Sequence, residues 1–261
     1  MRHISRETDA KTMPKAMIAR FFKGMSYFGR AFGFAFRRRA LLPWVLMPAL
    51  LTLVSTLGGA VFAWHWVGMA VHSHSGHGAL LDRLLWLLAV LAVGAGAYMI
   101  YVVACLVTTA PFAGLLSERT EQAVAKDAPA PSSGLAAALA SSLRGAVHAL
   151  VGIALYVAIA APLFLAHWLV PPLAPLCWVA CFVQTALFFA FDGFNEPLHR
   201  RGFGFRAKWR FIGSHLAESL GFGCVIALLT AVPLVSVLVA PLAIVGGTLL
   251  FADLQAPSPR S

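Results

Sequence analysis

The chain alternates long apolar segments with shorter polar and basic connections. Residues 41–64 and 84–110 contain no charged side chain. Each segment is longer than the about 20 residues that a helix needs to cross the roughly 30 Å hydrocarbon core of a bilayer. We therefore expect two long transmembrane helices here, in an all-α integral membrane protein.

Two further apolar regions are interrupted by prolines. Residues 145–191 are broken at Val170–Pro175, and residues 220–252 at Pro233 and Pro241. After the first break about 16 apolar residues remain, and before Pro233 about 13, which at about 1.5 Å per residue is too short to cross. The pattern predicts two Pro-broken helical hairpins that enter and leave on one side, and full crossings remain the alternative.

The first 40 residues differ from the rest because they are strongly basic. Within them, residues 17–36 interleave aromatic with basic side chains, the composition of an amphipathic helix that lies in the headgroup region. We expect three parts: a basic segment with this interfacial helix at 1–40, a single membrane domain at 41–252, and a tail at 253–261.

The distribution of Lys and Arg predicts the topology. Ten of the 20 precede Leu41, and only Arg83 falls between the first two predicted spans. Because cytoplasmic connections retain Lys and Arg, both termini should be cytoplasmic in a multi-pass protein. The same retention of Lys and Arg on the cytoplasmic side explains the net charge of +10, so we expect no nucleic-acid partner.

The composition excludes whole classes of protein. With 60% hydrophobic and 11% charged residues, the chain is no water-soluble domain. It has no nucleophile elbow, Walker loop, zinc-protease motif or paired carboxylates, so we expect neither an enzyme nor a cofactor. The four cysteines lie inside apolar runs and are expected to be buried small side chains rather than disulfides.

A His-rich segment lies between the two predicted spans. Imidazoles at such short separations can capture a divalent metal ion, and a loop with Ser and Gly can fold around it. The only carboxylate near these histidines in the sequence is Asp82. A flexible polar loop is therefore the better interpretation, and we predict no metal site. The weak candidate ligands are His72, His74 and His77.

The richest local pattern runs from Thr108 to Glu121. Pro111 is expected to end the spanning helix and to occupy the first turn of the next, with acidic residues in the early turns. This predicts a new helix at the cytoplasmic surface.

At this stretch the sequence resembles the CysZ sulfate permease and etoposide-induced-protein membrane family. The family's Pro-Phe-x-Gly-Leu-Leu-x-Glu stretch is matched by Pro111, Phe112, Gly114, Leu115, Leu116 and Glu118. Later matches, in the family's order, are Asp192, the basic cluster at 200–210, Phe222-Gly223, Pro233, Pro241 and residues 246–250.

The resemblance implies two long spans, two membrane-dipping hairpins and a homo-oligomer in a bacterial-type inner membrane that carries sulfate inward for cysteine synthesis. Sulfate binding in the family involves a Gly-Leu-Arg or Gly-Ile-Arg-Arg stretch just before the first span. Here Arg37, Arg38 and Arg39 keep the arginines, but the glycine is absent.

The arginine cluster has a physical rationale of its own. Three guanidinium groups at the start of a spanning helix can give a divalent oxyanion several charge-assisted hydrogen bonds, whereas the alternative is plain anchoring to lipid phosphates. Glu118 and Arg119 can pair with the cluster or control access to it, or else form a solvated helix face. The predicted function is a transporter or channel for sulfate or a similar oxyanion; the alternative is a non-transporting membrane scaffold or partner protein.

Overall fold

The computed structural model describes residues 4–39, 41–72, 79–124 and 135–255, and its described residues form helices joined by short turns. No strand occurs among them, which confirms the predicted all-α class. The helices are α1 (Ile4–Arg37), α2 (Leu42–His72), α3 (Ala79–Val124), α4 (Leu135–Leu169), α5 (Ala174–Arg200), α6 (Phe205–Ser214), α7 (Leu216–Thr230) and α8 (Pro233–Gln255), with a 3₁₀ turn at Pro171–Leu173.

Four segments of the described chain are long and apolar enough to cross a membrane: Leu42–His65, Val151–Leu169, Pro171–Arg200 and Val235–Gln255. The helices α6 and α7, bent by 99° at their junction, pass the same test only as a pair. The protein therefore has the helices of a multi-pass membrane protein. The first segment matches the predicted span at 41–64. The crossing predicted for 84–110 stays a prediction, because the apolar stretch that the structure describes there, Trp86–Ala97, is shorter than a span.

The predicted proline breaks are only partly right. Both expected interruptions exist, because α4 ends at Leu169 before the 3₁₀ turn and α7 ends at Thr230 before α8 begins at Pro233. Pro241, in contrast, lies inside α8.

Two predictions about helix ends are wrong. The helix α3 runs unbroken through residue 111, so no new helix begins there. The helix α5 continues to Arg200, so the second arm of the α4–α5 hairpin has 27 residues instead of a short arm ending near residue 191. The proline that suggested the first helix end and the polar residues that suggested the second both lie within a continuing helix.

The described chain divides into two compact units, and the predicted single domain at 41–252 stays a prediction. One unit is Leu46–Thr109, which holds most of α2 and the first part of α3. There the two helices approach closely, since a Cβ added at Gly59 would lie 3.0 Å from the side chain of Ile100. The other unit comprises Met1–Val45 and Ala110–Ser261.

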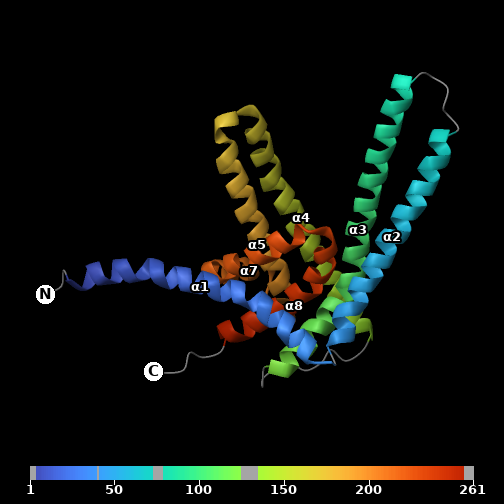
Figure 1. The fold of residues 1–261 in the computed structure, drawn as a ribbon. Helices are drawn as coiled ribbons and strands as arrows, with labels where there is room; N and C mark the ends of the chain where they lie inside the picture. Colours follow the sequence, from blue (N-terminus) through green and yellow to red (C-terminus); the bar gives the residue numbers. More distant parts are fainter. Residues whose placement is uncertain (1–3, 40, 73–78, 125–134, 256–261) are drawn as a thin grey trace. The chain divides into compact units, whose positions relative to one another are not determined.

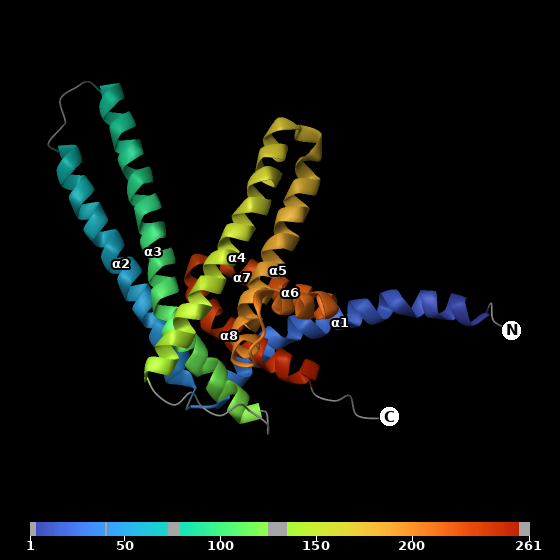
Figure 2. The ribbon, with the colours of Figure 1, turned by 180° about the vertical axis from the view of Figure 1, so that it is seen from behind.

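The larger unit is built on α5, α7 and α8. The helix α1 packs along α7 and α8, and α5 packs against both of those helices (Figure 1). Seen from behind, the short α6 lies beside α5 (Figure 2). Aromatic side chains fill the centre, where Phe194, Phe222 and Phe251 are fully buried and Trp209 stacks on Phe191 with ring centroids 5.1 Å apart.

Glycines let the central helices touch backbone to backbone. A Cβ added at Gly223 of α7 would overlap the carbonyl oxygen of Ala186 in α5. A Cβ added at Gly247 of α8 would overlap the carbonyl of Gly193, also in α5. Small residues at such contacts are how helices pack closely in membranes, where packing replaces the hydrophobic effect as the driving force.

Ion pairs attach α1 to the unit. Arg20 contacts Glu218 at 3.1 Å, and Lys23 contacts Asp253 at 2.5 Å. Burial, together with the hydrogen bond to Asp253, raises the pKa of Tyr27 from 10.0 to about 12. The opposite face of α1 exposes apolar side chains, namely Ile18, Phe22, Phe32 and Phe36. The helix is therefore two-sided, as the sequence predicted for residues 17–36.

Candidate functional site

The last turns of α3 have two chemically different faces. Side chains at 113, 116, 117, 120 and 121 are buried, the spacing of one face of a helix. Leu115, Glu118, Arg119 and Gln122 lie on the other side and line a cavity. Both faces belong to the larger unit, so each can be described with its own neighbours.

The cavity is bounded by the end of α1 and the end of α3. It has a volume of about 550 Å³, large enough for a small hydrated anion, and its lining is Arg38, Leu41, Leu115, Glu118, Arg119, Gln122 and Ala123. Two of these side chains carry a positive charge and one a negative charge. The cavity is therefore positive on balance.

Aromatic rings and a backbone carbonyl hold the two arginines in place. Arg38 donates a hydrogen bond to the carbonyl of Ala123 at 3.3 Å and lies over the ring of Phe34, 4.7 Å from its centroid. Arg119 lies over Trp44 at 4.3 Å. Cation–π contacts orient a guanidinium without neutralising its charge. No carboxylate of the described residues lies within ion-pair distance of either arginine.

The carboxylate of Glu118 is tied to its own helix. Its Oε1 accepts a hydrogen bond from Gln122 at 3.2 Å, one turn further along α3. Pairing of Glu118 with the arginine cluster was one of the possibilities raised by the sequence. In the structure Glu118 lines the cavity and forms no ion pair with Arg38.

Of the three arginines predicted from the sequence, only Arg38 lines the cavity. Arg37 is the last residue of α1 and Arg39 lies two positions after it; all three arginines are exposed, but Arg37 and Arg39 do not line the cavity. The structure therefore brings together Arg38, Glu118 and Arg119, and their anion binding stays a prediction.

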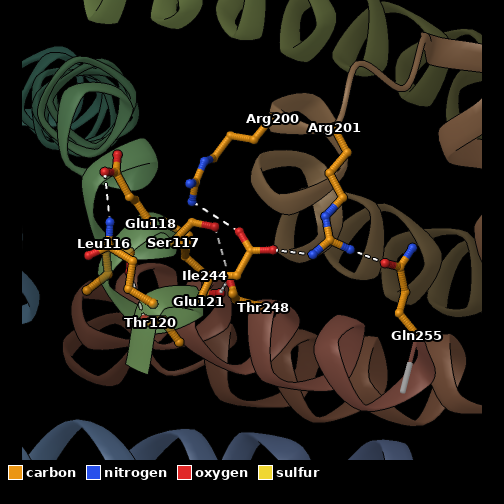
Figure 3. Close-up of polar contacts among 11 residues, drawn as sticks. Leu116, Ser117, Glu118, Thr120, Glu121, Arg200, Arg201, Ile244, Thr248 and Gln255 are labelled. Atoms are coloured by element: carbon orange, nitrogen blue, oxygen red, sulfur yellow. Dashed lines mark hydrogen bonds and ion pairs between the residues drawn. The ribbon is translucent and has the colours of Figure 1, made fainter. Parts of the chain in front are cut away.

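The buried face of α3 carries a second charged group that the sequence did not single out. The carboxylate of Glu121 is fully buried between two guanidinium groups: Arg200 at 3.1 Å and Arg201 at 2.6 Å (Figure 3). Arg201 also lies over the ring of Phe251 at 4.5 Å and contacts the side chain of Gln255. We call Glu121, Arg200 and Arg201 the ion triad.

Hydroxyl groups continue the polar contact between α3 and α8. Ser117 and Thr248 share a hydrogen bond of 3.1 Å, and Thr248 also donates to the carbonyl of Ile244 (Figure 3). Both hydroxyls are buried. The end of α3 is therefore fixed to α5 by charge and to α8 by hydroxyl contacts.

Comparison with known families decides what kind of protein has this site. A family model described as sulfate transporter CysZ/etoposide-induced protein 2.4 matches residues 27–241. This chain belongs to that family. It is also similar to a protein named sulfate transporter CysZ from Pectobacterium atrosepticum, with 27% identity over 219 residues that cover 80% of this chain and 77% of that protein.

The residues that match the CysZ family motif have different environments. Leu116 is almost fully buried, Leu115 and Glu118 line the cavity, and Gly114 faces Glu196, whose Oε2 would lie 3.6 Å from an added Cβ. The ring of Phe112 lies 6.1 Å from that of Trp44, which holds Arg119. The motif therefore builds the wall of the cavity as well as part of its charge.

The remaining predicted residues lie apart from the cavity. Asp192 is exposed on α5, Pro233 begins α8, and Pro241 lies within it. Among the weak metal candidates, His72 ends α2, while His74 and His77 lie outside the described residues. The described residues hold no group of three or more His, Cys, Asp or Glu side chains placed to bind a metal.

Proposed function

We propose that this chain carries sulfate or a similar oxyanion across the inner membrane of a bacterial cell and so supplies sulfur assimilation. Membership of the CysZ family supports the class of protein, and the cavity supports the class of ligand. The observation that carries the proposal is the pair Arg38, just after α1, and Arg119 of α3, which line a cavity of about 550 Å³ and are held by aromatic rings and a backbone carbonyl. Guanidinium groups match the oxygens of sulfate in both geometry and charge.

The proposed topology places both termini and the cavity on the cytoplasmic side. It follows from the charge distribution, because nearly all Lys and Arg then face the cytoplasm. In this orientation the exposed apolar face of α1 lies in the headgroup layer. We further propose that several copies assemble, since the family resemblance implies an oligomer.

Transport is tested by uptake of labelled sulfate into proteoliposomes. Replacing Arg38 or Arg119 by Ala should lower the rate of uptake about tenfold or more, because each lost charge-assisted hydrogen bond is worth about 1.5 to 3 kcal/mol. The membrane potential is clamped at zero, because an inside-negative potential opposes anion uptake by about 2.3 kcal/mol per charge per 100 mV.

Arg30→Ala is the matched control for both variants. Arg30 also lies over an aromatic ring, that of Tyr27 at 4.7 Å, but it does not line the cavity. Its uptake should equal that of the unmodified protein. If the folded protein gives no flux above empty vesicles, transport is refuted and a membrane scaffold becomes the better description.

Both arms of the α4–α5 hairpin are long enough to cross the bilayer. We also propose that the hairpin nevertheless enters from the cytoplasmic side and ends within the bilayer, on the strength of its tip. Residues 168–178 at its tip carry no charged side chain, with His167 just before them, and Trp168 and Trp178 are 71% and 64% exposed. Three of the tip residues are prolines that lack an N–H group. The amides of Val170 and Leu173 bond to Ala166 and Val170, each at 2.9 Å. In hydrocarbon every backbone amide must be satisfied internally, so such a tip tolerates lipid.

Cysteine labelling tests this depth. Pro172→Cys, in a chain whose four native cysteines are replaced by Ala, should stay unlabelled when intact cells receive a membrane-impermeant thiol reagent. His74→Cys lies in the connection that the charge distribution places outside and should be labelled fully. Labelling of position 172 from outside would show that the hairpin crosses.

A further inference from the structure

The ion triad has the geometry of an occupied anion site. Each oxygen of the Glu121 carboxylate faces a different guanidinium, Oε2 toward Arg200 and Oε1 toward Arg201 (Figure 3). Glu121 is fully buried, whereas the side chains of Arg200 and Arg201 keep 15% and 22% of their surface exposed. The carboxylate is thus the innermost part of the group.

Arg201 is held in position by contacts that do not involve Glu121. Its guanidinium lies over Phe251 and its second nitrogen, Nη1, contacts Gln255, both on α8. Arg200 belongs to the last turn of α5, one turn after Glu196, which lies within electrostatic range. Arg201 is therefore directed toward this point by contacts of its own, and Arg200 reaches the same point from the last turn of α5.

A tetrahedral oxyanion satisfies this arrangement by the same chemistry as a carboxylate. Guanidinium groups bind the edge of two oxygens in carboxylate, sulfate or phosphate alike. Within the triad two positive charges meet one negative charge, and a dianion brings two. A sulfate ion at this point would turn one edge of two oxygens toward Arg200 and another edge toward Arg201.

We propose that Glu121 is a tethered carboxylate occupying an oxyanion site formed by Arg200 and Arg201, and that sulfate takes its place when this side chain turns away. The proposal takes its ligand from the proposed function, but the site is distinct from the cavity because it lies on the other face of α3. Glu121 then controls access to this site.

Removing the tethered carboxylate should create sulfate binding. Glu121→Ala and Glu121→Gln are prepared on a chain that also carries Arg38→Ala and Arg119→Ala, so that the cavity contributes nothing. Melting temperatures of the purified protein are compared in sodium sulfate and in sodium chloride at equal ionic strength. Sulfate at ten times its dissociation constant should raise the Tm of both variants by about 4 °C relative to chloride.

The parent chain with Glu121 intact should show no such difference, and neither should Asp253→Ala on the same background. Asp253 is also a carboxylate paired with a base, Lys23, and the charge of Arg30 lies within electrostatic range, but both side chains of the ion pair are partly exposed, whereas Glu121 is fully buried. If a Glu121 variant is monodisperse only in sulfate, the proposal is likewise supported.

Equal Tm values in the two salts for both variants would overturn the proposal and leave the ion triad as a purely structural contact. Failure of both variants to become monodisperse even in sulfate would overturn it as well. Neither result tests sulfate uptake through the cavity. That uptake is tested separately by Arg38→Ala and Arg119→Ala, each made in the otherwise unmodified chain.

Discussion

Gly223→Ala should destabilise the protein severely although it adds a single methyl group. The new Cβ would overlap the carbonyl oxygen of Ala186, so α7 and α5 must move apart. Because backbone cannot rotate away as a side chain can, we expect a loss of about 3 kcal/mol or more. This corresponds to a drop in Tm of about 10 °C, measured by thermal melting in detergent.

Gly213→Ala in α6 is the matched control, since nothing lies within 4 Å of a Cβ at that position. Alanine favours helix more than glycine does, so this variant should melt at the same temperature or slightly higher. A Tm for Gly223→Ala equal to that of Gly213→Ala would show that the close approach of α5 and α7 is not required.

The second large effect is expected for Arg201→Ala. This change leaves the buried carboxylate of Glu121 with Arg200 alone and removes the contacts to Phe251 and Gln255. Removing one partner of a buried ion pair costs about 3 to 5 kcal/mol, because the remaining charge loses its compensation in a low dielectric. Thermal melting should show the largest drop among single arginine variants.

Two comparisons isolate the role of the guanidinium. Arg201→Lys keeps the charge but not the planar fork, so its Tm should fall between those of Ala and the unmodified protein. Arg206→Ala removes an exposed arginine of α6 and should change stability by less than about 0.5 kcal/mol. If Arg201→Ala and Arg206→Ala have the same Tm, the ion triad contributes nothing to stability.

The apolar pattern predicted helix positions well wherever prolines were grouped. Pro171 and Pro172 follow the end of α4, and Pro175 follows in the first turn of α5, so the break was correct. A single proline proved a poorer guide, since Pro111 and Pro241 were expected to interrupt helices and lie inside α3 and α8. One missing amide is tolerated in a membrane helix because neighbouring groups satisfy the freed carbonyl.

Polar residues misled the prediction at the end of α5. Asp192, Asn195 and Glu196 looked like a connection, yet the helix continues past them. Asn195 accepts a hydrogen bond of 2.6 Å from the buried Lys208 of α6. Asn195 thus serves a contact inside the protein, and hydropathy alone cannot distinguish such a helix from a loop.

The candidate site was predictable only where its residues lie in recognisable stretches. Arg38 precedes a span, and Glu118 and Arg119 belong to the motif after the second predicted span, so all three were found. The ion triad was missed because Glu121 and Arg200 are 79 positions apart and no local spacing links them. The available signals were the glutamate one helical turn after Glu118 and the basic cluster at 200–210, which nothing in the sequence joins.

The two faces of α3 couple the cavity to the ion triad. Glu118 and Glu121 lie one turn apart on a single helix, so a shift or rotation of its end displaces both together. A ligand that stabilises one position of this helix at the cavity therefore changes the free energy of the contacts around Arg200 and Arg201. If sulfate binds at both places as proposed, occupancy of either would change the affinity of the other by the same factor, because such linkage is reciprocal.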